Sequence, residues 1–202
     1  NSPWLIDTAE IVQPPREFYI RTLTVTSPTQ IDITFFVDSL AELRNLEIDT
    51  SKLGVNFDMV ERYPSNLFPG LGDIYLPDTV SAIYNAARYY QIGSNDSCGD
   101  DHYSTIGRTM YIQAELFDFF QNKVLWNAFE LENAVVNIYR LYRDYGAGFQ
   151  LIETIPGGAI EYDYVDDISA YDNQRGTFCY KVEAEYLLTK PNGFVEALTS
   201  SS

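Results

Sequence analysis

The sequence predicts an all-β protein built as two tandem Greek-key β-sandwiches. The main observation is an internal repeat with a spacing of about ninety residues. GVNFDMVERYP, residues 54–64, corresponds to GAGFQLIETIP, residues 146–156, with Gly, Phe, Glu and Pro in step. A repeat of this length suits one complete small sandwich domain and is too long for a solenoid unit.

Two more segment pairs and the composition support the duplication. DITFF at residues 32–36 corresponds to KVLWN at 123–127, and RYYQIGS at 88–94 corresponds to FCYKVEA at 178–184. The 202 residues are 46% hydrophobic and 15% aromatic, which is enough for two separate cores. We therefore predict a tail of a preceding domain and a linker at 1–15, a first domain at 16–113 and a second at 114–202.

The strands are predicted from alternating apolar residues interrupted by turn residues. Residues 2–12 have a short strand pattern that stops at Pro14-Pro15, a pair that stiffens a linker. The strands expected in the first copy are 18–25, 31–37, 43–50, 57–63, 73–76, 88–94 and 108–114. Those expected in the second are 123–127, 135–143, 149–155, 161–165, 177–186 and 194–198. Residues 79–90 are interpreted as an irregular approach to a strand, with a helical turn as the competing interpretation.

Alternation also predicts which side chains face the cores. The core side of the strand at 177–186 is expected to carry Phe178, Tyr180, Val182 and Ala184, with Cys179 and Lys181 outward. The corresponding core residues in the first copy are Tyr90, Ile92 and Ser94. Phe35 and Trp126 take equivalent positions, where a sandwich holds its large central aromatic.

The net charge restricts the class of partner. The chain has 29 acidic and 13 basic residues, a formal charge of −16. This charge repels nucleic acid and anionic membranes, so we expect no nucleic-acid partner. No stretch is long and apolar enough for a transmembrane segment. The acidity suits a secreted or surface protein, and the abrupt ends suggest a fragment of a longer polypeptide.

Catalytic patterns are weak. His102 is the only histidine and lies in GDDHYST, where we expect a solvated loop. No G-x-S-x-G nucleophile motif accompanies it. A pair of carboxylates, as in a glycosidase, is no evidence of catalysis here, because a chain with 29 acidic residues contains many such pairs by chance. The glycine-rich segments precede strands rather than the helices that cradle phosphates. We therefore predict that the chain is not an enzyme and has no catalytic or cofactor-binding residues.

Two acidic clusters are candidate calcium sites, because Ca²⁺ takes six to eight oxygen ligands from such loops. The candidates are Asp96, Asp100 and Asp101 in one loop, and Asp163, Asp166 and Asp167 in or after another strand. Neither cluster has the D-x-D-x-D-G spacing, and the alternative is that these residues form ordinary turns. Cys98 and Cys179 fall in different copies and are expected to be free or partly covered thiols, with pairing to parts of the protein outside this sequence as the alternative.

The second copy resembles a fibronectin type III-like domain. The segments that carry this resemblance are VLWNAFE, NIYR at 137–140, G-x-x-F-x-L-I-x-T-I-P-G-G from Gly146, EYDYVDD at 161–167 and Y-x-V-x-A at 180–184. More narrowly, NDSCGD at 95–100 followed by GRTMYI at 107–112 is similar to a junction in tandem domains of large Bacteroidetes surface proteins. Those proteins are associated with gliding motility and type IX secretion.

The resemblance implies a non-catalytic spacer or an adhesion and assembly module at the cell surface or in the extracellular space. The implied partners are neighbouring domains of the same chain, and other surface or secretion proteins or glycans. One alternative is a carbohydrate-binding or calcium-dependent ligand-binding module, with Tyr139, Tyr142 and Tyr145 as an exposed aromatic platform. Accessory domains of a secreted hydrolase are another. Residues 109–117 contain no Pro or Gly, which predicts a stiff joint.

Overall fold

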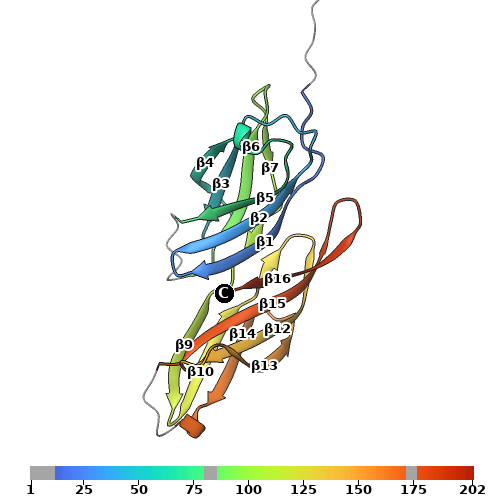
Figure 1. Cartoon of the computed structure of the whole chain (residues 1–202). Coiled ribbons are helices and arrows are strands. Elements are labelled where there is room, and N and C mark those ends of the chain that lie inside the picture. Colours follow the sequence, from blue (N-terminus) through green and yellow to red (C-terminus); the bar gives the residue numbers. More distant parts are fainter. Residues whose placement is uncertain (1–11, 80–85, 172–176) are drawn as a thin grey trace, which may run out of the picture.

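Antiparallel β-sheets form nearly all of the regular secondary structure in the computed structural model, which describes residues 12–79, 86–171 and 177–202 (Figure 1). In the N-terminal half, one sheet has the order β1-β2-β5, from Phe18–Ser27, Gln30–Val37 and Gly72–Asp78. The second sheet contains β4, β3, β6 and β7, which are Asp58–Pro64, Asn45–Ser51, Tyr89–Asn95 and Asp101–Tyr103. A short 3-10 turn, η1, covers Ser65–Leu67.

The C-terminal half repeats this arrangement. Its first sheet has the order β9-β10-β14, from Ile112–Asp118, Gln121–Asn127 and Glu161–Asp167. Its second has the order β13-β12-β15-β16, from Gln150–Pro156, Ala134–Asp144, Cys179–Thr189 and Val195–Ser201. The 3-10 turn η2 covers Ser169–Tyr171. The predicted all-β tandem sandwich, fibronectin type III-like in strand order, is confirmed.

The repeat extends to a β-bulge. In the first half, the pairing of β3 with β4 shifts register between Ile48 and Asp49. In the second half, the pairing of β12 with β13 shifts between Leu141 and Tyr142, at the corresponding point of the repeated motif. A bulge of one residue bends and twists an edge strand. The segment identified as a repeat therefore encodes the same edge strand twice.

The predicted core faces are confirmed for most positions along the central strands, whereas Phe178 and Tyr180 are only partly buried. Val182 and Ala184 are fully buried, Cys179 is exposed, and Tyr90, Ile92 and Ser94 are buried. Phe35 and Trp126 also lie inside their cores. Each of these positions follows from the two-residue period of a strand, in which alternate side chains face opposite sides of the sheet.

Three predicted elements differ. The single strand expected at 108–114 is divided into β8, Gly107–Arg108, and β9, because the chain leaves one sheet there and enters another. Asn127 stabilises this crossing: its Oδ1 accepts from the N–H of Tyr111 at 2.7 Å. His102 lies in β7 and not in a solvated loop. Most of the strand pattern at 2–12 and of the segment 79–90 lies outside the described residues.

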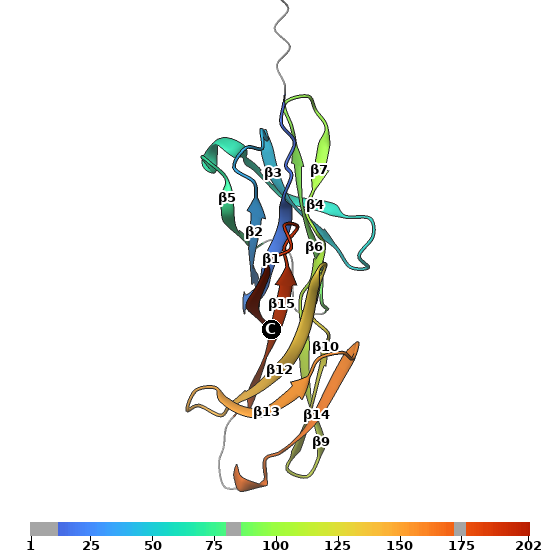
Figure 2. The ribbon, with the colours of Figure 1, turned by 90° about the vertical axis from the view of Figure 1, so that its right-hand side faces the viewer.

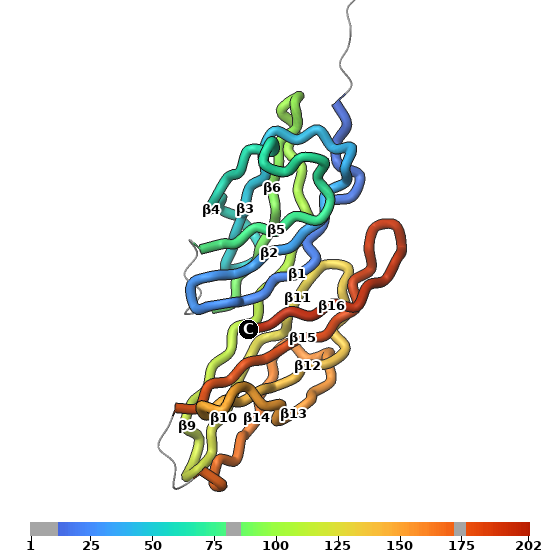
Figure 3. The backbone as a smooth tube through the Cα atoms, viewed as in Figure 1, coloured from blue at the N-terminus to red at the C-terminus, as the bar shows by residue number. Residues whose placement is uncertain are grey.

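The two halves lie end to end along one long axis (Figures 1 and 2). β16 returns from the hairpin that it forms with β15 and ends at the waist of the molecule, where Ser202 lies (Figure 3). This return places the last strand of the second half beside β1 of the first. The residue border predicted between 113 and 114 falls inside β9 and stays a prediction.

Candidate functional site at the joint between the halves

A strand pairing joins the two halves. β8 pairs with β6 of the first half on one side and with β11, Glu130–Leu131, on the other. The β11 strand belongs to the connection between β10 and β12, so a segment of the second half extends a sheet of the first. Backbone pairing fixes the relative position of two segments in register and direction. The joint is therefore more than a single covalent linker.

Gly107 makes this close approach possible. A Cβ atom at residue 107 would lie 2.6 Å from Cδ1 of Leu23 and 3.1 Å from Cδ1 of Leu131. Leu23 belongs to β1 of the first half and Leu131 to β11 of the second, and both are buried. Only glycine lets the backbone of β8 lie between two such side chains without displacing them.

Side chains cover the free edge of β1. The Tyr186 hydroxyl, from β15, donates to the carbonyl of Arg21 at 2.5 Å. The backbone N–H of Leu23 donates to Oγ of Ser200 at 3.3 Å, and that of Ile20 donates to Oγ1 of Thr105 at 2.9 Å. Exposed edge strands pair with other chains unless something blocks them. Two of these three contacts come from the second half, so the joint also protects this edge.

Charged contacts surround the same joint. Arg21 contacts Asp73 of its own half at 2.6 Å and also pairs with Glu196 on β16. At the other side of the joint, Arg108 contacts Glu130 at 2.7 Å. Partly buried ion pairs of this kind fix geometry more than they add stability. They bias the two halves toward one mutual orientation.

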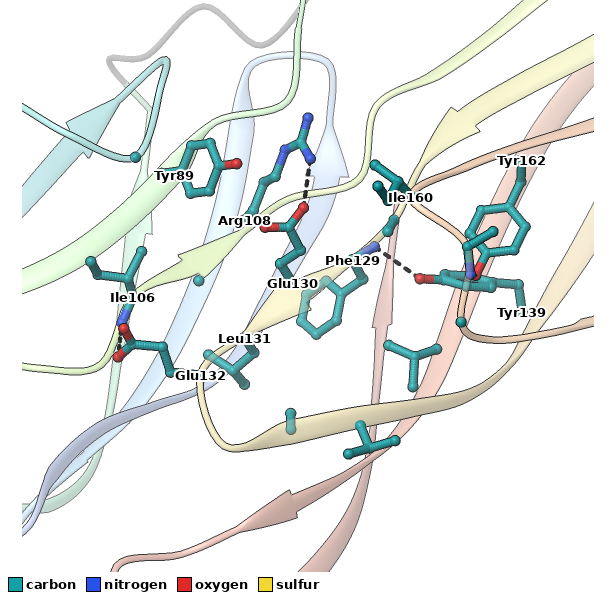
Figure 4. Close-up of a pocket in the computed structure, with 18 residues that line it drawn as sticks. Tyr89, Ile106, Arg108, Phe129, Glu130, Leu131, Glu132, Tyr139, Ile160 and Tyr162 are labelled. Atoms are coloured by element: carbon teal, nitrogen blue, oxygen red, sulfur yellow. Dashed lines mark hydrogen bonds and ion pairs between the residues drawn. The ribbon is translucent and has the colours of Figure 1, made fainter.

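A cavity of about 660 Å³ lies beside β8 and β11 (Figure 4). Arg108 and Tyr89 form one wall, where the guanidinium carbon lies 5.3 Å from the ring centroid. Deeper in, the Tyr139 hydroxyl accepts from the N–H of Phe129 at 2.9 Å. The Glu132 carboxylate accepts from the N–H of Ile106 at 3.0 Å. The contact of Glu132 with Ile106 joins the two halves, so the cavity belongs to the joint.

The predicted tyrosine platform is wrong, because its members do not share a face. Tyr139 is only 1% exposed and packs against Trp126 and Tyr162 in the core. Residues 139 and 142 lie an odd number of positions apart in β12, so their side chains point to opposite faces.

The other two platform tyrosines have separate partners. The Lys181 ammonium lies over the ring of Tyr142, with 4.9 Å between Nζ and the ring centroid. Tyr145 packs against Tyr171, with 4.6 Å between the ring centroids. The three rings therefore offer no common stacking surface for a sugar.

In the first acidic cluster, both carboxylate oxygens of Asp96 already have hydrogen-bond partners within the protein. Its Oδ1 accepts from the N–H groups of Cys98 and Asp100 at 2.8 and 3.0 Å, and its Oδ2 lies 3.1 Å from Nε2 of His102. These contacts, led by His102, lower the pKa of Asp96 below its usual range. The Asp101 carboxylate accepts from the side chain of Asn95. The carboxylates stabilise the turn between β6 and β7.

The second acidic cluster is divided between the faces of β14. Asp166 is buried, and both of its carboxylate oxygens accept from Nη1 of Arg143, at 2.7 and 2.9 Å. The hydroxyl of Tyr180 also donates to the Asp166 carboxylate, at 2.7 Å. Asp163 faces outward and pairs with Lys123. The Asp167 carboxylate accepts a hydrogen bond from the backbone N–H of Ser169 at 2.9 Å. Strand alternation separates residue 166 from 163 and 167. Across the described ranges, no group of three or more His, Cys, Asp or Glu residues is placed to hold a metal.

The two cysteines are free, as predicted, and both are exposed. Cys98 lies in the turn between β6 and β7, at the far end of the first half, and Cys179 begins β15 in the second (Figure 1). The described part of the chain also contains no helix long and apolar enough to cross a bilayer.

Asp49 is a group that sequence patterns did not indicate. It is 7% exposed on β3, and burial raises its pKa to about 6. The neighbouring Glu47 raises the pKa further, whereas Arg62 opposes the shift. Its Oδ2 lies so close to β6 that a Cβ at Gly93 would be 2.7 Å away. No sequence motif marks this residue, because its burial results from the packing of β3 against β6.

The raised pKa of Asp49 predicts a pH-dependent stability. Because the folded state binds this proton more tightly than the unfolded state, the stability due to this group is present below about pH 4 and is lost as the pH rises to about 6. Asp49→Asn should therefore be more stable than the parent at pH 7, by up to about 3 kcal/mol, and equal to it at pH 3. Urea denaturation across this range measures the difference. Asp58→Asn, which removes an exposed carboxylate, is the matched control, and an Asp49→Asn difference that does not change with pH contradicts the prediction.

The sequence matches no family profile and no curated protein. Among solved structures, it is similar to a tetra-tandem repeat in the extending region of a large adhesion protein, at 12% identity and TM-score 0.30 over 92% of this chain and 48% of that one. The chicken CNTN1 FN1-FN3 domains match at 13% identity and TM-score 0.31 over 93% and 66%. A Ca²⁺-stabilised adhesin that helps an Antarctic bacterium bind ice matches at 12% identity and TM-score 0.28 over 95% and 49%. This chain thus spans about half the length of two of these and 66% of the third.

Proposed function

We propose that this chain is a non-catalytic spacer in an exported adhesion or assembly protein of the cell surface, with its two modules held as one stiff unit. The observation that carries the proposal is the joint, in which β11 of the second half extends a sheet of the first. A flexible tether between independent modules needs no such pairing. A segment that sets a distance or transmits force needs such a pairing, because a sheet shared by the two modules fixes their relative position.

The composition and the contacts at the joint support this role. The charge of −16 favours solubility outside the cell and disfavours nucleic acid. The side-chain contacts that cover β1 and the pairing at β8 lie at different points of the joint, so bending would break several contacts at once. The partners of this role are neighbouring domains and other surface or secretion proteins. Gliding motility and type IX secretion are the setting that the sequence resemblance suggests.

No contact favours the other two functions. The tyrosines expected to bind a glycan do not form a platform, and within the described ranges the acidic residues form no metal-binding group. A role beside a hydrolase domain has no observation of its own in this chain. The spacer role is therefore the function that the geometry supports best.

The two free cysteines allow the stiffness to be measured in the natural sequence. Nitroxide labels on Cys98 and Cys179 lie in different halves, so the width of their distance distribution reports motion between the halves. We expect a single narrow distribution in pulsed electron paramagnetic resonance. Arg21→Glu, which repels Asp73 and Glu196 at the joint, should broaden it.

Arg62→Glu is the matched control, because its ion pair with Glu47, at 2.8 Å, lies wholly within the first half. This variant should leave the distance distribution narrow. A broad distribution in the parent chain would overturn the spacer proposal. Equal broadening in the two variants would show that Arg21 does not act through the joint.

A further inference from the structure

The outer face of the second sheet of the first half contains the buried carboxylate of Asp49. This residue, on β3, is only 7% exposed, and within residues 12–79, 86–171 and 177–202 its side chain has no hydrogen bond or ion pair. The residues opposite it are Met59 on β4 and Gln91 on β6, and neither is charged. Burial penalises an ionised carboxylate, so such groups are normally paired. A cation placed beside Asp49 would remove this penalty.

Gly93 determines where this carboxylate lies. A Cβ atom at residue 93 would be 2.7 Å from Oδ2 of Asp49 and 3.5 Å from Cε1 of Tyr103. Tyr103, on β7, pairs with Gly93 and is 56% exposed. Because glycine has no side chain, the carboxylate and the tyrosine ring lie against the same point of β6. They are therefore neighbours on the outer face of the sheet.

Glu47 adds a second carboxylate to this face. It precedes Asp49 by two positions on β3, so the two side chains point to the same side of the sheet. Glu47 also pairs with Gly93 on β6. Arg62, on β4, contacts Glu47 at 2.8 Å, so its charge is directed to that carboxylate. Two carboxylates next to Gly93 thus share one arginine and leave an excess of negative charge.

The second half has an ammonium group at the corresponding place. Tyr142 and Asp49 are equivalent, because each directly follows the bulge that the two halves share. Tyr142 pairs with Lys181 as Asp49 pairs with Gln91. The Lys181 ammonium lies 4.9 Å from the ring centroid of Tyr142 and 5.6 Å from that of Phe149. The first half has an uncharged amide where the second half has this cation.

The charges around Lys181 are also balanced differently. The equivalent of Gly93 is Glu183, whose carboxylate lies 3.8 Å from Nζ of Lys181 and 3.8 Å from Nη1 of Arg140. Arg140 pairs with Glu183 as Glu47 pairs with Gly93, so arginine in the second half corresponds to glutamate in the first. The second half therefore supplies both cations of this face from its own sequence. The first half has carboxylates and an amide at the equivalent positions.

We propose that Asp49, Glu47 and Tyr103 form a binding site for a primary ammonium group, which a lysine side chain of a partner protein provides. The ammonium would take the place that Lys181 has in the second half. It would make charge-assisted hydrogen bonds to the carboxylates, and the lysine stem would lie along the tyrosine ring. This inference goes beyond the spacer function, because it gives the unit a contact on its side, where β4, β6 and β7 lie (Figure 2).

The chemistry of the site favours lysine over a divalent ion. Ca²⁺ takes six to eight oxygen ligands, and across the described ranges no group of three or more His, Cys, Asp or Glu residues is placed to hold a metal. An exposed tyrosine ring beside a carboxylate suits a side chain that is apolar along its stem and charged at its tip. The charge of −16 also attracts basic partner surfaces over a longer range.

The test uses the isotope-labelled 202-residue chain and Nα-acetyl-lysine methylamide as the probe, at pH 7.5 and low salt. We expect saturable chemical-shift changes at the amides of Gly93 and Tyr103, and weaker binding as salt is added. Nα-acetyl-norleucine methylamide, which lacks the ammonium, should leave these amides unchanged. Asp49→Asn should weaken binding about tenfold or more. Asp58→Asn, which removes an exposed carboxylate from β4, is the matched control and should leave binding unchanged.

A second variant supplies the cation from within the chain. Gln91→Lys copies the arrangement of Lys181, so it should lower the pKa of Asp49 by about one unit or more and weaken binding of the probe. Carboxyl chemical shifts measured against pH report this pKa. Gln91→Met is the control, because it also loses the hydrogen bond from Gln91 to the carbonyl of Ser104, at 3.2 Å, but adds no charge.

No saturable change in the parent chain, or equal binding by the parent and Asp49→Asn chains, would overturn the site. Equal binding of the norleucine probe would overturn the role of the ammonium, and a Gln91→Lys chain with an unshifted Asp49 would overturn the equivalence with Lys181. Binding of Ca²⁺ at these amides without binding of the lysine probe would replace the proposal by a metal site. The label distance between the two cysteines is measured without probe, so the spacer function stands or fails separately.

Discussion

Replacing Trp126 by alanine is expected to lower the free energy of unfolding of the C-terminal half by about 3–5 kcal/mol. The side chain is 3% exposed and lies at the centre of that core. Its ring stacks on Tyr162 with 5.4 Å between centroids and meets Tyr139 edge-on at 6.3 Å. Truncation removes these contacts and leaves a cavity that a rigid sandwich cannot close. Urea denaturation followed by far-ultraviolet circular dichroism measures the loss.

Trp126→Phe is the matched variant, because the first half holds Phe35 at the equivalent buried position. The indole Nε1 is buried and has no hydrogen-bond partner among the described residues, so phenylalanine sacrifices no hydrogen bond. We expect this variant to lose about 1–2 kcal/mol, mainly through the smaller ring. An equal loss in the two variants, or a loss below about 1 kcal/mol for Trp126→Ala, would contradict the central packing role.

Gly107→Ala is expected to disturb the joint, with a cost of about 1–3 kcal/mol. The new methyl group would lie 2.6 Å from Cδ1 of Leu23, a fully buried side chain that would have to shift. The distance distribution between labels on Cys98 and Cys179 should broaden as well. Denaturation and the spin-label measurement therefore report the same collision in two independent ways.

A double-mutant cycle identifies the collision partner. Leu23→Ala alone should cost about 2–5 kcal/mol, because it empties a buried site. In the double variant, the methyl group added at residue 107 occupies part of the space that Leu23 leaves. The combined cost should therefore fall below the sum of the single costs by about 1 kcal/mol or more. Additive costs would show that residue 107 does not act on the joint through Leu23.

Local patterns in the sequence predicted the elements of this fold well. Alternation placed Val182 and Ala184 in the core and Cys179 outside, as the structure has them. The repeat around Gly54 and Gly146 predicted two copies of one strand, and the structure adds that both carry the same bulge. Side-chain direction along a strand depends on parity alone, so a few residues are enough to predict it.

The same patterns did not predict which side chains meet. The platform of Tyr139, Tyr142 and Tyr145 was expected from spacing within one segment, but strand parity and burial separate the rings. The burial that raises the pKa of Asp49 also depends on how β3 packs against β6. Such environments are built from neighbours on other strands, and the spacing of residues in one segment carries no information about them.

The sequence by itself determined that this protein is a duplicated all-β chain with large aromatic cores, a strongly acidic composition and one cysteine in each copy. Only the tertiary structure decided how the copies join. The hydroxyl of Tyr186 contacts the carbonyl of Arg21 across 165 positions of the chain, and the N–H of Leu23 contacts Ser200 across 177. Alternation and turn signals act over a few residues, whereas the joint arises from strands that only folding brings side by side.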